Sequence, residues 1–169
     1  MDSSTTNTQQ RATLWTLIKD TRFAMFMTRH NNGHFHARPM TTQNKDLGED
    51  CLWFFMPKDG ETVADIGAEA QVNVSYANTD DDNYVSVSGR ASVVDDPAKS
   101  QALWSKMADA WFPGGSDDPN LALVKVQISH AHYWDVEESK IVQLYMMAKA
   151  SVTGKPPTDL GKSVEVRMD

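Results

Sequence analysis

The chain has 169 residues, of which 40% are hydrophobic and 23% are charged, a composition typical of one globular domain and not of a disordered chain. Its 16 Lys and Arg residues are outnumbered by 23 Asp and Glu residues, which gives a formal net charge of −7. This acidic balance argues against nucleic acid as the main partner, because a phosphate backbone requires a basic surface.

Cysteine content and hydropathy exclude further classes. The single cysteine, Cys51, rules out an intramolecular disulfide and a cysteine-built metal site, and its place in an apolar run predicts an inert buried thiol. No run approaches the ~20 apolar residues of a membrane span, and the polar N-terminal sequence lacks the pattern of a secretory signal. We therefore expect a cytoplasmic protein without a membrane partner.

The first part of the chain predicts a helix and then a hairpin. We expect residues 1–6 to be disordered and residues 7–20 to form a helix, because apolar side chains recur there at helical spacing. Its buried stripe would consist of Leu14, Leu17 and Ile18. Residues 22–30 and 34–42 flank an Asn-Asn-Gly sequence, which favours a hairpin because Asn and Gly tolerate positive φ. An apolar strand follows at 51–56.

The middle of the chain predicts a short helix at 61–68 and two strands, at 71–77 and 84–94. Both strands alternate between apolar and polar residues, so that one face of each would be buried. An acidic residue directly before a proline, at 95–97, predicts the N-cap of a second main helix that runs to about residue 110.

The last part predicts a long strand at 121–136, in which the apolar phase slips between Leu123 and Val124 and suggests a bulge there. We expect a closing strand at 141–148 and a flexible tail at 150–169. About seven strands joined by hairpins or short helices indicate a mainly β (α+β) domain over residues 7–149, an antiparallel barrel with helices on its outside.

One region combines residues suited to an anion attached to a flat ring. Arg38, Lys58 and Thr62, together with the N–H groups of a helix N-terminus, are the donors that phosphate groups prefer. An aromatic strand lies between them in the sequence and suits a ring system. The residue types alone leave another interpretation open, in which Arg38 forms a surface ion pair and Trp53–Phe55 belong to the core.

Five motifs in a fixed order resemble the FMN-binding split-barrel superfamily, closest to the general stress protein 26-like relatives of pyridoxamine 5′-phosphate oxidase: ARPM, LWFFM with a following Lys, NVSYAN with YVSVSGRA, LW…WFPGG…DP, and YWD. The resemblance covers residues 14–136. It implies an antiparallel split β-barrel that forms a homodimer and holds FMN, with FAD as the other candidate, in a groove between the subunits. It also implies these cofactor-binding positions: Arg38, Pro39, Met40, Thr41, Trp53, Phe54, Phe55, Met56, Lys58, Thr62, Trp111 and Trp134.

The phosphate end departs from the family pattern. Thr62 stands where family members often carry a Lys, and Asp59 and Glu61 bring negative charge close to a dianion unless they point away. The C-terminal sequence also lacks a match to the segment that binds substrate in the oxidases, which disfavours pyridoxamine 5′-phosphate oxidase activity. The resemblance therefore implies an FMN-binding general stress protein whose only enzymatic role would be a weak flavin-dependent oxidoreductase activity. No catalytic residue is assigned.

Two alternatives come from other classes of protein. The pairs His34/His36 and His130/His132 each place two imidazoles on one face of a strand, as in a metal-dependent barrel enzyme. Neither pair has a carboxylate at tight spacing, which favours histidines without a metal, and His30 beside the turn is expected at the surface. The other alternative is a dimeric interaction module that has lost the cofactor.

Overall fold

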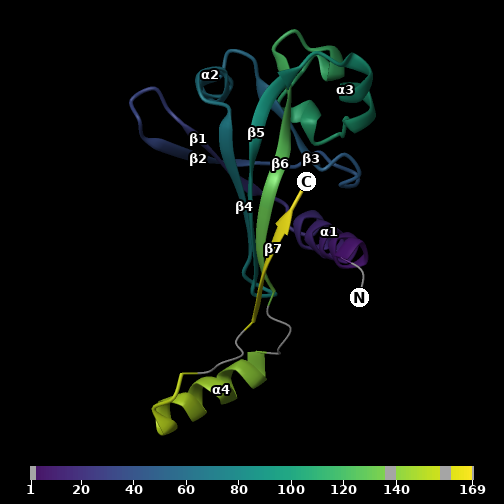
Figure 1. The fold of residues 1–169 in the computed structure, drawn as a ribbon. Helices are drawn as coiled ribbons and strands as arrows, with labels where there is room; N and C mark the ends of the chain where they lie inside the picture. The colour runs from purple at the N-terminus through teal and green to yellow at the C-terminus, as the bar shows by residue number, and fades with distance from the viewer. Residues whose placement is uncertain (1–2, 136–139, 157–160, 169) are drawn as a thin grey trace.

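The computed structural model describes residues 3–135, 140–156 and 161–168. In this part of the chain, seven strands form one antiparallel sheet in the order β2-β1-β4-β5-β6-β3, with β7 also paired to β6 (Figure 1). The strands are β1 (Ala24–Arg29), β2 (Phe35–Met40), β3 (Cys51–Pro57), β4 (Gln71–Asn78), β5 (Asn83–Val94), β6 (Leu121–Asp135) and β7 (Lys162–Arg167). The helices are α1 (Ser3–Lys19), α2 (Glu61–Ala68), α3 (Pro97–Leu103) and α4 (Lys140–Thr153), with 3-10 turns η1 (Ala108–Ala110) and η2 (Gly115–Asp117).

The long strand β6 explains why the barrel is split. One edge of β6 pairs with β5 along nearly its whole length, while the other edge pairs first with β3 and then with β7. The chain after β2 returns to β3, where the amide of Gln43 donates to the carbonyl of Trp53 at 2.8 Å. The two ends of the sheet therefore approach each other, and the sheet curls into the expected antiparallel split barrel with flanking helices.

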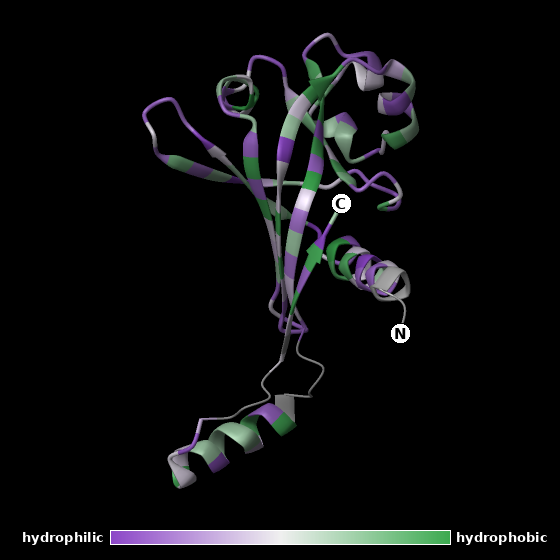
Figure 2. Ribbon diagram, viewed as in Figure 1, coloured by the Kyte–Doolittle hydropathy of each residue, from purple (hydrophilic) through white to green (hydrophobic). Residues whose placement is uncertain are grey.

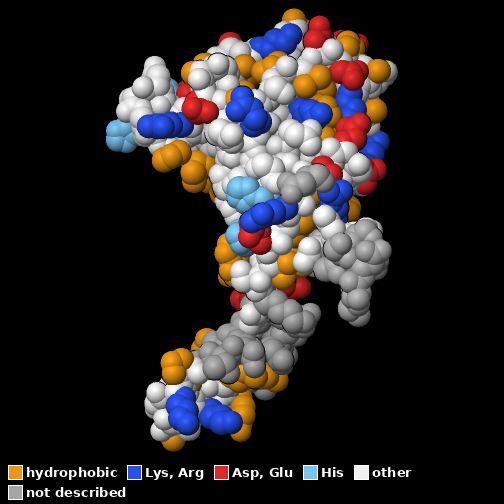
Figure 3. All heavy atoms as spheres, viewed as in Figure 1, with side chains coloured by type: hydrophobic (Ala, Val, Ile, Leu, Met, Phe, Trp, Pro, Cys, Tyr) orange, Lys and Arg blue, Asp and Glu red, His pale blue; other side chains and the backbone are white. Residues whose placement is uncertain are grey.

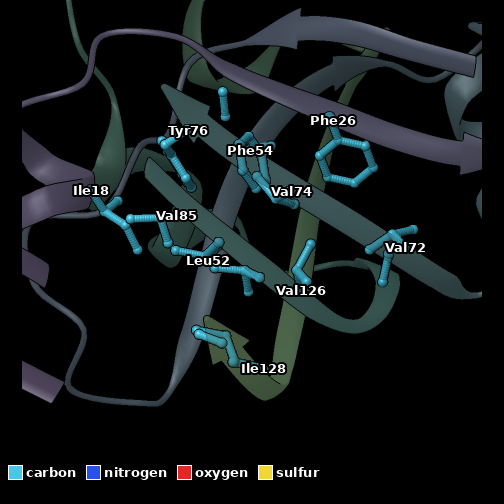
Figure 4. Close-up of a cluster of buried hydrophobic side chains, with 14 of the residues drawn as sticks. Ile18, Phe26, Leu52, Phe54, Val72, Val74, Tyr76, Val85, Val126 and Ile128 are labelled. Carbon is cyan, nitrogen blue, oxygen red and sulfur yellow. The ribbon is translucent and has the colours of Figure 1, made fainter. Parts of the chain in front are cut away.

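The main core lies inside the curled sheet and under α1. The predicted stripe of Leu14, Leu17 and Ile18 is buried there, with Trp15 partly buried beside it. The ring of Phe26 meets that of Phe54 edge-on at 5.1 Å. Figure 4 shows side chains from α1 and from β1, β3, β4, β5 and β6 converging in this cluster. Figure 2 shows the alternation of hydropathy along the strands that produces it.

A second apolar cluster covers the other face of β3. It joins Trp53 and Phe55 to residues of α3, η1 and the loop that follows, including Leu103 and Phe112. Because both of its faces are covered, the first half of β6 is buried at four consecutive positions, 121–124. Apolar residues therefore occupy both faces of β6 here. This double burial explains the slip in the apolar pattern from which the sequence predicted a bulge.

The register irregularity lies elsewhere in β6, and the predicted position of the bulge is wrong. Ser88 of β5 pairs with His130, whereas the next residue, Gly89, pairs with Ile128, so Ser129 is the extra residue. A Cβ atom at Gly89 would overlap the carbonyl oxygen of Gln127. The backbone of β6 therefore comes close to β5 at a point that only glycine accommodates.

Three further expectations are corrected. The strand expected at 141–148 is instead part of α4, whose Leu, Met, Ala, Lys and Gln residues are good helix formers. Part of the expected tail, 150–169, forms β7, which pairs with β6 and buries Val166. At the other end, α1 begins at Ser3, within the segment expected to be disordered, although residues 1 and 2 lie outside the described part.

Other local predictions are confirmed. The short helix has the predicted bounds, and α3 begins with Asp96 as N-cap, whose side chain accepts from the amide of Lys99 at 2.9 Å. α3 ends at Leu103, earlier than expected, and η1 follows after a turn. In the described residues, no helix is both long and apolar enough to cross a membrane.

Candidate functional site

The β1–β2 hairpin and α2 bring together six polar side chains, which we name the Arg38 cluster: Thr28, His30, His36, Arg38, Glu61 and Asp65. The predicted Asn-Asn-Gly turn forms this hairpin, with Gly33 at φ 84°. In the resulting register, Arg38 lies opposite Phe26 and His36 opposite Thr28. Helix α2, which packs against β1, then supplies the two carboxylates.

Asp65 is the buried centre of the cluster, with 4% of the residue exposed. Its Oδ2 accepts from the Thr28 hydroxyl at 2.7 Å, and its Oδ1 accepts from Nδ1 of His30 at 2.8 Å. Desolvation alone would raise the pKa of Asp65, but the hydrogen bonds from Thr28 and His30 and the positive charge of Arg38 lower that pKa overall. The carboxyl group is therefore ionised at neutral pH.

Arg38 is committed to this carboxylate network. Its Nη1 donates to the Thr28 hydroxyl at 2.7 Å, and its Nη2 lies 3.6 Å from Asp65 and 3.8 Å from Glu61. With neutral imidazoles, two carboxylates face one guanidinium, so the cluster carries a net negative charge. Glu61 thus does not point away from the predicted phosphate site, and a dianion there would have to compete with it.

The two histidines of the cluster lie side by side. The rings of His30 and His36 are parallel within 8° with centroids 4.9 Å apart, and Glu61 reaches towards both of them. His30, which we expected at the surface, is partly buried by this stacking and by its bond to Asp65. His34 is exposed in the turn region before β2 and does not join the group.

The predicted aromatic strand contributes its backbone rather than its side chains. The side chains of Trp53, Phe54, Phe55 and Met56 are all buried, alternating between the two apolar clusters. The N–H and C=O of Trp53 are used by Asn44 and Gln43 on the edge opposite β6. Because backbone groups point the same way at every second residue of an antiparallel strand, those of Phe55 also face this open edge.

The N-terminus of α2 follows directly after the open edge of β3. Its N-cap, Gly60, makes no side-chain capping hydrogen bond, so the first amides of the helix are free of a side-chain cap. Thr62 lies in this first turn but is buried, and Lys58 is exposed in the preceding turn, where its amide donates to the carbonyl of Asn120 at 2.8 Å. Among the described contacts, none joins the side chains of Lys58 and Thr62 to Arg38.

The remaining predicted positions are spread over the hairpin and the outer surface. Pro39 is exposed on the edge strand β2, where its missing N–H is tolerated, while Met40 packs against the core and Thr41 is partly buried. Trp111 is 80% exposed, and Trp134 is exposed on the outer face of the sheet, stacked with His132. The structure therefore does not bring these two tryptophans to the Arg38 cluster within one chain.

The sheet is hollowed where β1, β2, β4, β5 and β6 contribute residues to one cavity. This hollow has a volume of about 430 Å³, and Met27, Phe35, Asn73 and His130 are among its lining residues. A second hollow of about 350 Å³ lies beside Trp53 and is lined mainly by polar residues near Cys51. On the face shown in Figure 3, acidic and basic side chains of the described residues are interspersed.

Several features of the site were not predicted from the sequence. Thr28 and Asp65 lie far apart in the sequence and gave no separate signal. The only hint was the unfavourable charge of Glu61 near the expected phosphate. The predicted burial of the Cys51 thiol is confirmed, and desolvation raises its pKa to about 11.

Comparison with known proteins identifies the family. The sequence matches the protein family described as pyridoxamine 5′-phosphate oxidase like over residues 9–158, which is most of the chain. The chain belongs to the pyridoxamine 5′-phosphate oxidase-like family. It is similar to Protein bli-3 of Neurospora crassa, with 26% identity over 154 residues that cover 86% of this chain and 74% of that protein.

Solved structures of general stress proteins share this fold. A general stress FMN/FAD binding protein from Xanthomonas citri is 33% identical with a TM-score of 0.68, over 78% of this chain and 92% of that one. A protein related to general stress protein 26 from Clostridium acetobutylicum has a TM-score of 0.67 at 16% identity, over 91% of each chain. The similarities support the general stress protein 26-like branch of the pyridoxamine 5′-phosphate oxidase-like family, as the motifs predicted.

Proposed function

We propose that this protein is a flavin-binding general stress protein that binds FMN, with FAD as the other candidate. The observation that carries the proposal is that two features follow each other along the chain. The first is the open strand edge at Phe55, and the second is the helix N-terminus at Gly60, which has no side-chain cap. Such an edge offers hydrogen bonds to a planar ring, and such a terminus offers amides to a phosphate. The FMN/FAD binding relative from Xanthomonas citri supports the same function.

Each part of the site has a distinct task under this proposal. The backbone N–H and C=O of Phe55 orient the polar rim of the ring, while buried side chains on both faces of β3 keep the strand rigid. Bound FMN supplies hydride or electron transfer, and the protein supplies its position and electrostatic surroundings. A carboxylate and imidazole network, rather than a basic pocket, surrounds Arg38.

The phosphate end fits a dianion only after a rearrangement. Asp65 is buried and has both oxygens engaged, so it stays in place. Glu61 is different, because 55% of its side chain is exposed and its contact with Arg38 is 3.8 Å long. We infer that Glu61 swings into solvent when a phosphate binds, and that the phosphate adds less to affinity than a purely basic site would provide.

We also propose a homodimer in which the second subunit completes the site. Met25, Phe35, Tyr84 and Trp134 are exposed on the open side of the sheet, and a second copy would cover such apolar surface. Trp111 is exposed far more than a tryptophan usually is, which suits a residue that covers a ring bound by the partner.

Titration of apo protein with FMN, FAD and riboflavin tests the function, with tryptophan fluorescence as the readout. Arg38→Ala should weaken FMN binding by roughly tenfold, because a hydrogen bond to a charged group contributes about 1.5 kcal/mol or more, and should leave riboflavin binding nearly unchanged. Glu61→Gln should strengthen FMN binding by about fivefold, because it removes a negative charge that repels the phosphate. Glu69→Gln, an exposed residue at the opposite end of α2, is the matched control and should bind FMN like the wild type.

The outcomes separate the parts of the proposal. No fluorescence change with any flavin at high micromolar concentration would overturn flavin binding and favour the cofactor-free module. Equal losses of FMN and riboflavin binding in Arg38→Ala would refute the phosphate role of Arg38. Retention of flavin by a proven monomer would refute the shared groove, and reduction of bound flavin by NADH or NADPH would establish the oxidoreductase activity.

A further inference from the structure

Three potential metal ligands converge at the tip of the β1–β2 hairpin. Ligand atoms of His30, His36 and Glu61 all lie within 4.8 Å of one another. The histidines come from the two arms of the hairpin, and Glu61 is the first residue of α2. We propose that these three residues bind a divalent transition-metal ion of the zinc type.

The spacing of the ligands is close to that of a bound site. In a tetrahedral zinc site, bonds of 2.0–2.2 Å place neighbouring ligand atoms about 3.3–3.5 Å apart. The three side chains need to converge by only about 1.5 Å or less to reach that spacing. His36 and Glu61 are free to do so, because their side chains are 38% and 55% exposed, while His30 stays where Asp65 holds it.

Present contacts leave the ligands uncommitted to one another. Glu61 lies 3.4 Å from Nδ1 of His30, the nitrogen that Asp65 already holds, and 3.7 Å from Nδ1 of His36, and both contacts are too long for strong hydrogen bonds. The two rings are parallel within 8°, and a nitrogen lone pair lies in the plane of its ring, so the partly exposed ring of His36 has to rotate before both imidazoles reach one ion. A cation between these three groups would therefore replace weak contacts with coordinate bonds.

Asp65 prepares His30 for this role. A carboxylate only accepts, so the 2.8 Å bond from Nδ1 of His30 fixes the proton on that nitrogen and leaves the lone pair on Nε2. Histidines that bind metals commonly make such a bond with their other nitrogen. Asp65 is buried and also held by Thr28, so it fixes the orientation of the ring.

Charge and ligand type select the class of ion. Glu61 and Asp65 outweigh the single positive charge of Arg38, whose Nη2 lies 3.8 Å from Glu61, so the cluster attracts a cation despite this guanidinium. Two imidazoles and one carboxylate favour zinc, copper, nickel or cobalt over calcium and magnesium, which prefer sets of oxygen ligands. A fourth position remains for water, because three protein ligands do not fill a tetrahedral site.

Calorimetric titration of the untagged protein with Zn²⁺ tests the proposal. We expect one equivalent to bind, and we expect His36→Gln and Glu61→Gln each to weaken binding by roughly tenfold or more. His34→Gln is the matched control, because His34 lies in the same hairpin but outside the cluster, and it should bind like the wild type. Co²⁺ in place of Zn²⁺ gives an independent absorption signal from the coordinated ion.

Two results would overturn the proposal. The first is the absence of Zn²⁺ binding by the folded wild-type protein at high micromolar concentration. The second is binding that neither His36→Gln nor Glu61→Gln weakens, which would place the ion elsewhere. Circular dichroism of each variant shows whether it is folded, and Co²⁺ absorption of the wild type tests the site even where a variant is not. Neither measurement involves flavin, so the proposal stands or falls independently of the flavin function.

Discussion

Replacing Asp65 with asparagine probes the buried centre of the Arg38 cluster. The ionised carboxylate accepts hydrogen bonds from Thr28 at 2.7 Å and from His30 at 2.8 Å, and it lies 3.6 Å from Arg38. Asparagine keeps the shape and one acceptor, but it loses the charge and one of these bonds. A hydrogen bond to a charged group contributes about 1.5–3 kcal/mol, so Asp65→Asn should lower the free energy of unfolding by about 2–3 kcal/mol at pH 7.

Urea denaturation and thermal melting measure this loss, which corresponds to a decrease in Tm of roughly 4–12 °C for a chain of this size. The pH dependence gives a second test. The pKa of Asp65 is lowered on folding, so its contribution is present above the unfolded-state value, near 3.8, and is lost as the pH falls through the lower folded-state value. The difference between wild type and Asp65→Asn should therefore shrink on acidification below about pH 4.

The exposed Asp59→Asn variant is the control and should unfold like the wild type. A loss below about 0.5 kcal/mol for Asp65→Asn at pH 7 would refute the role assigned to the buried carboxylate, because exposed substitutions commonly change stability by that much. A large loss that stays constant on acidification would show that packing, rather than the ionised group, explains the effect.

Two other predictions concern the barrel itself. Gly89→Ala should destabilise the fold by about 1–3 kcal/mol in urea denaturation, because its Cβ would overlap the carbonyl of Gln127. Gly67→Ala, in open space on α2, is the control and should be neutral or stabilising. Equal effects of the two substitutions would contradict this account. Cys51, whose pKa is raised to about 11 by burial, should react with a thiol reagent at pH 8 far more slowly in the native than in the urea-unfolded protein, and equal rates would contradict its burial.

Strand alternation and turn residues account for most of what the sequence predicted correctly. The period-2 pattern of β4 and β5, the Asn-Gly turn and the Asp96-Pro97 helix start are local signals, and each forms as predicted. Local signals failed where one pattern fits two structures. The apolar run in α4 suited a strand or a helix equally, and the buried run in β6 resembled a bulge because two apolar clusters cover its faces.

The same difference between local and long-range signals applies to the candidate site. The sequence alone determined that Arg38 lies on a strand, that α2 begins after the apolar strand β3, and that Glu61 brings negative charge to that helix start. What surrounds Arg38 depends on contacts between elements that are far apart in the sequence. Thr28 and Asp65 meet there because the barrel folds α2 onto the hairpin, and a contact between residues 37 positions apart leaves no periodic trace in the sequence. The same folding places His30 against His36 and gathers Glu61 and Asp65 around Arg38. The composition gives the net charge of the chain, but it could not locate the negative charge of this cluster.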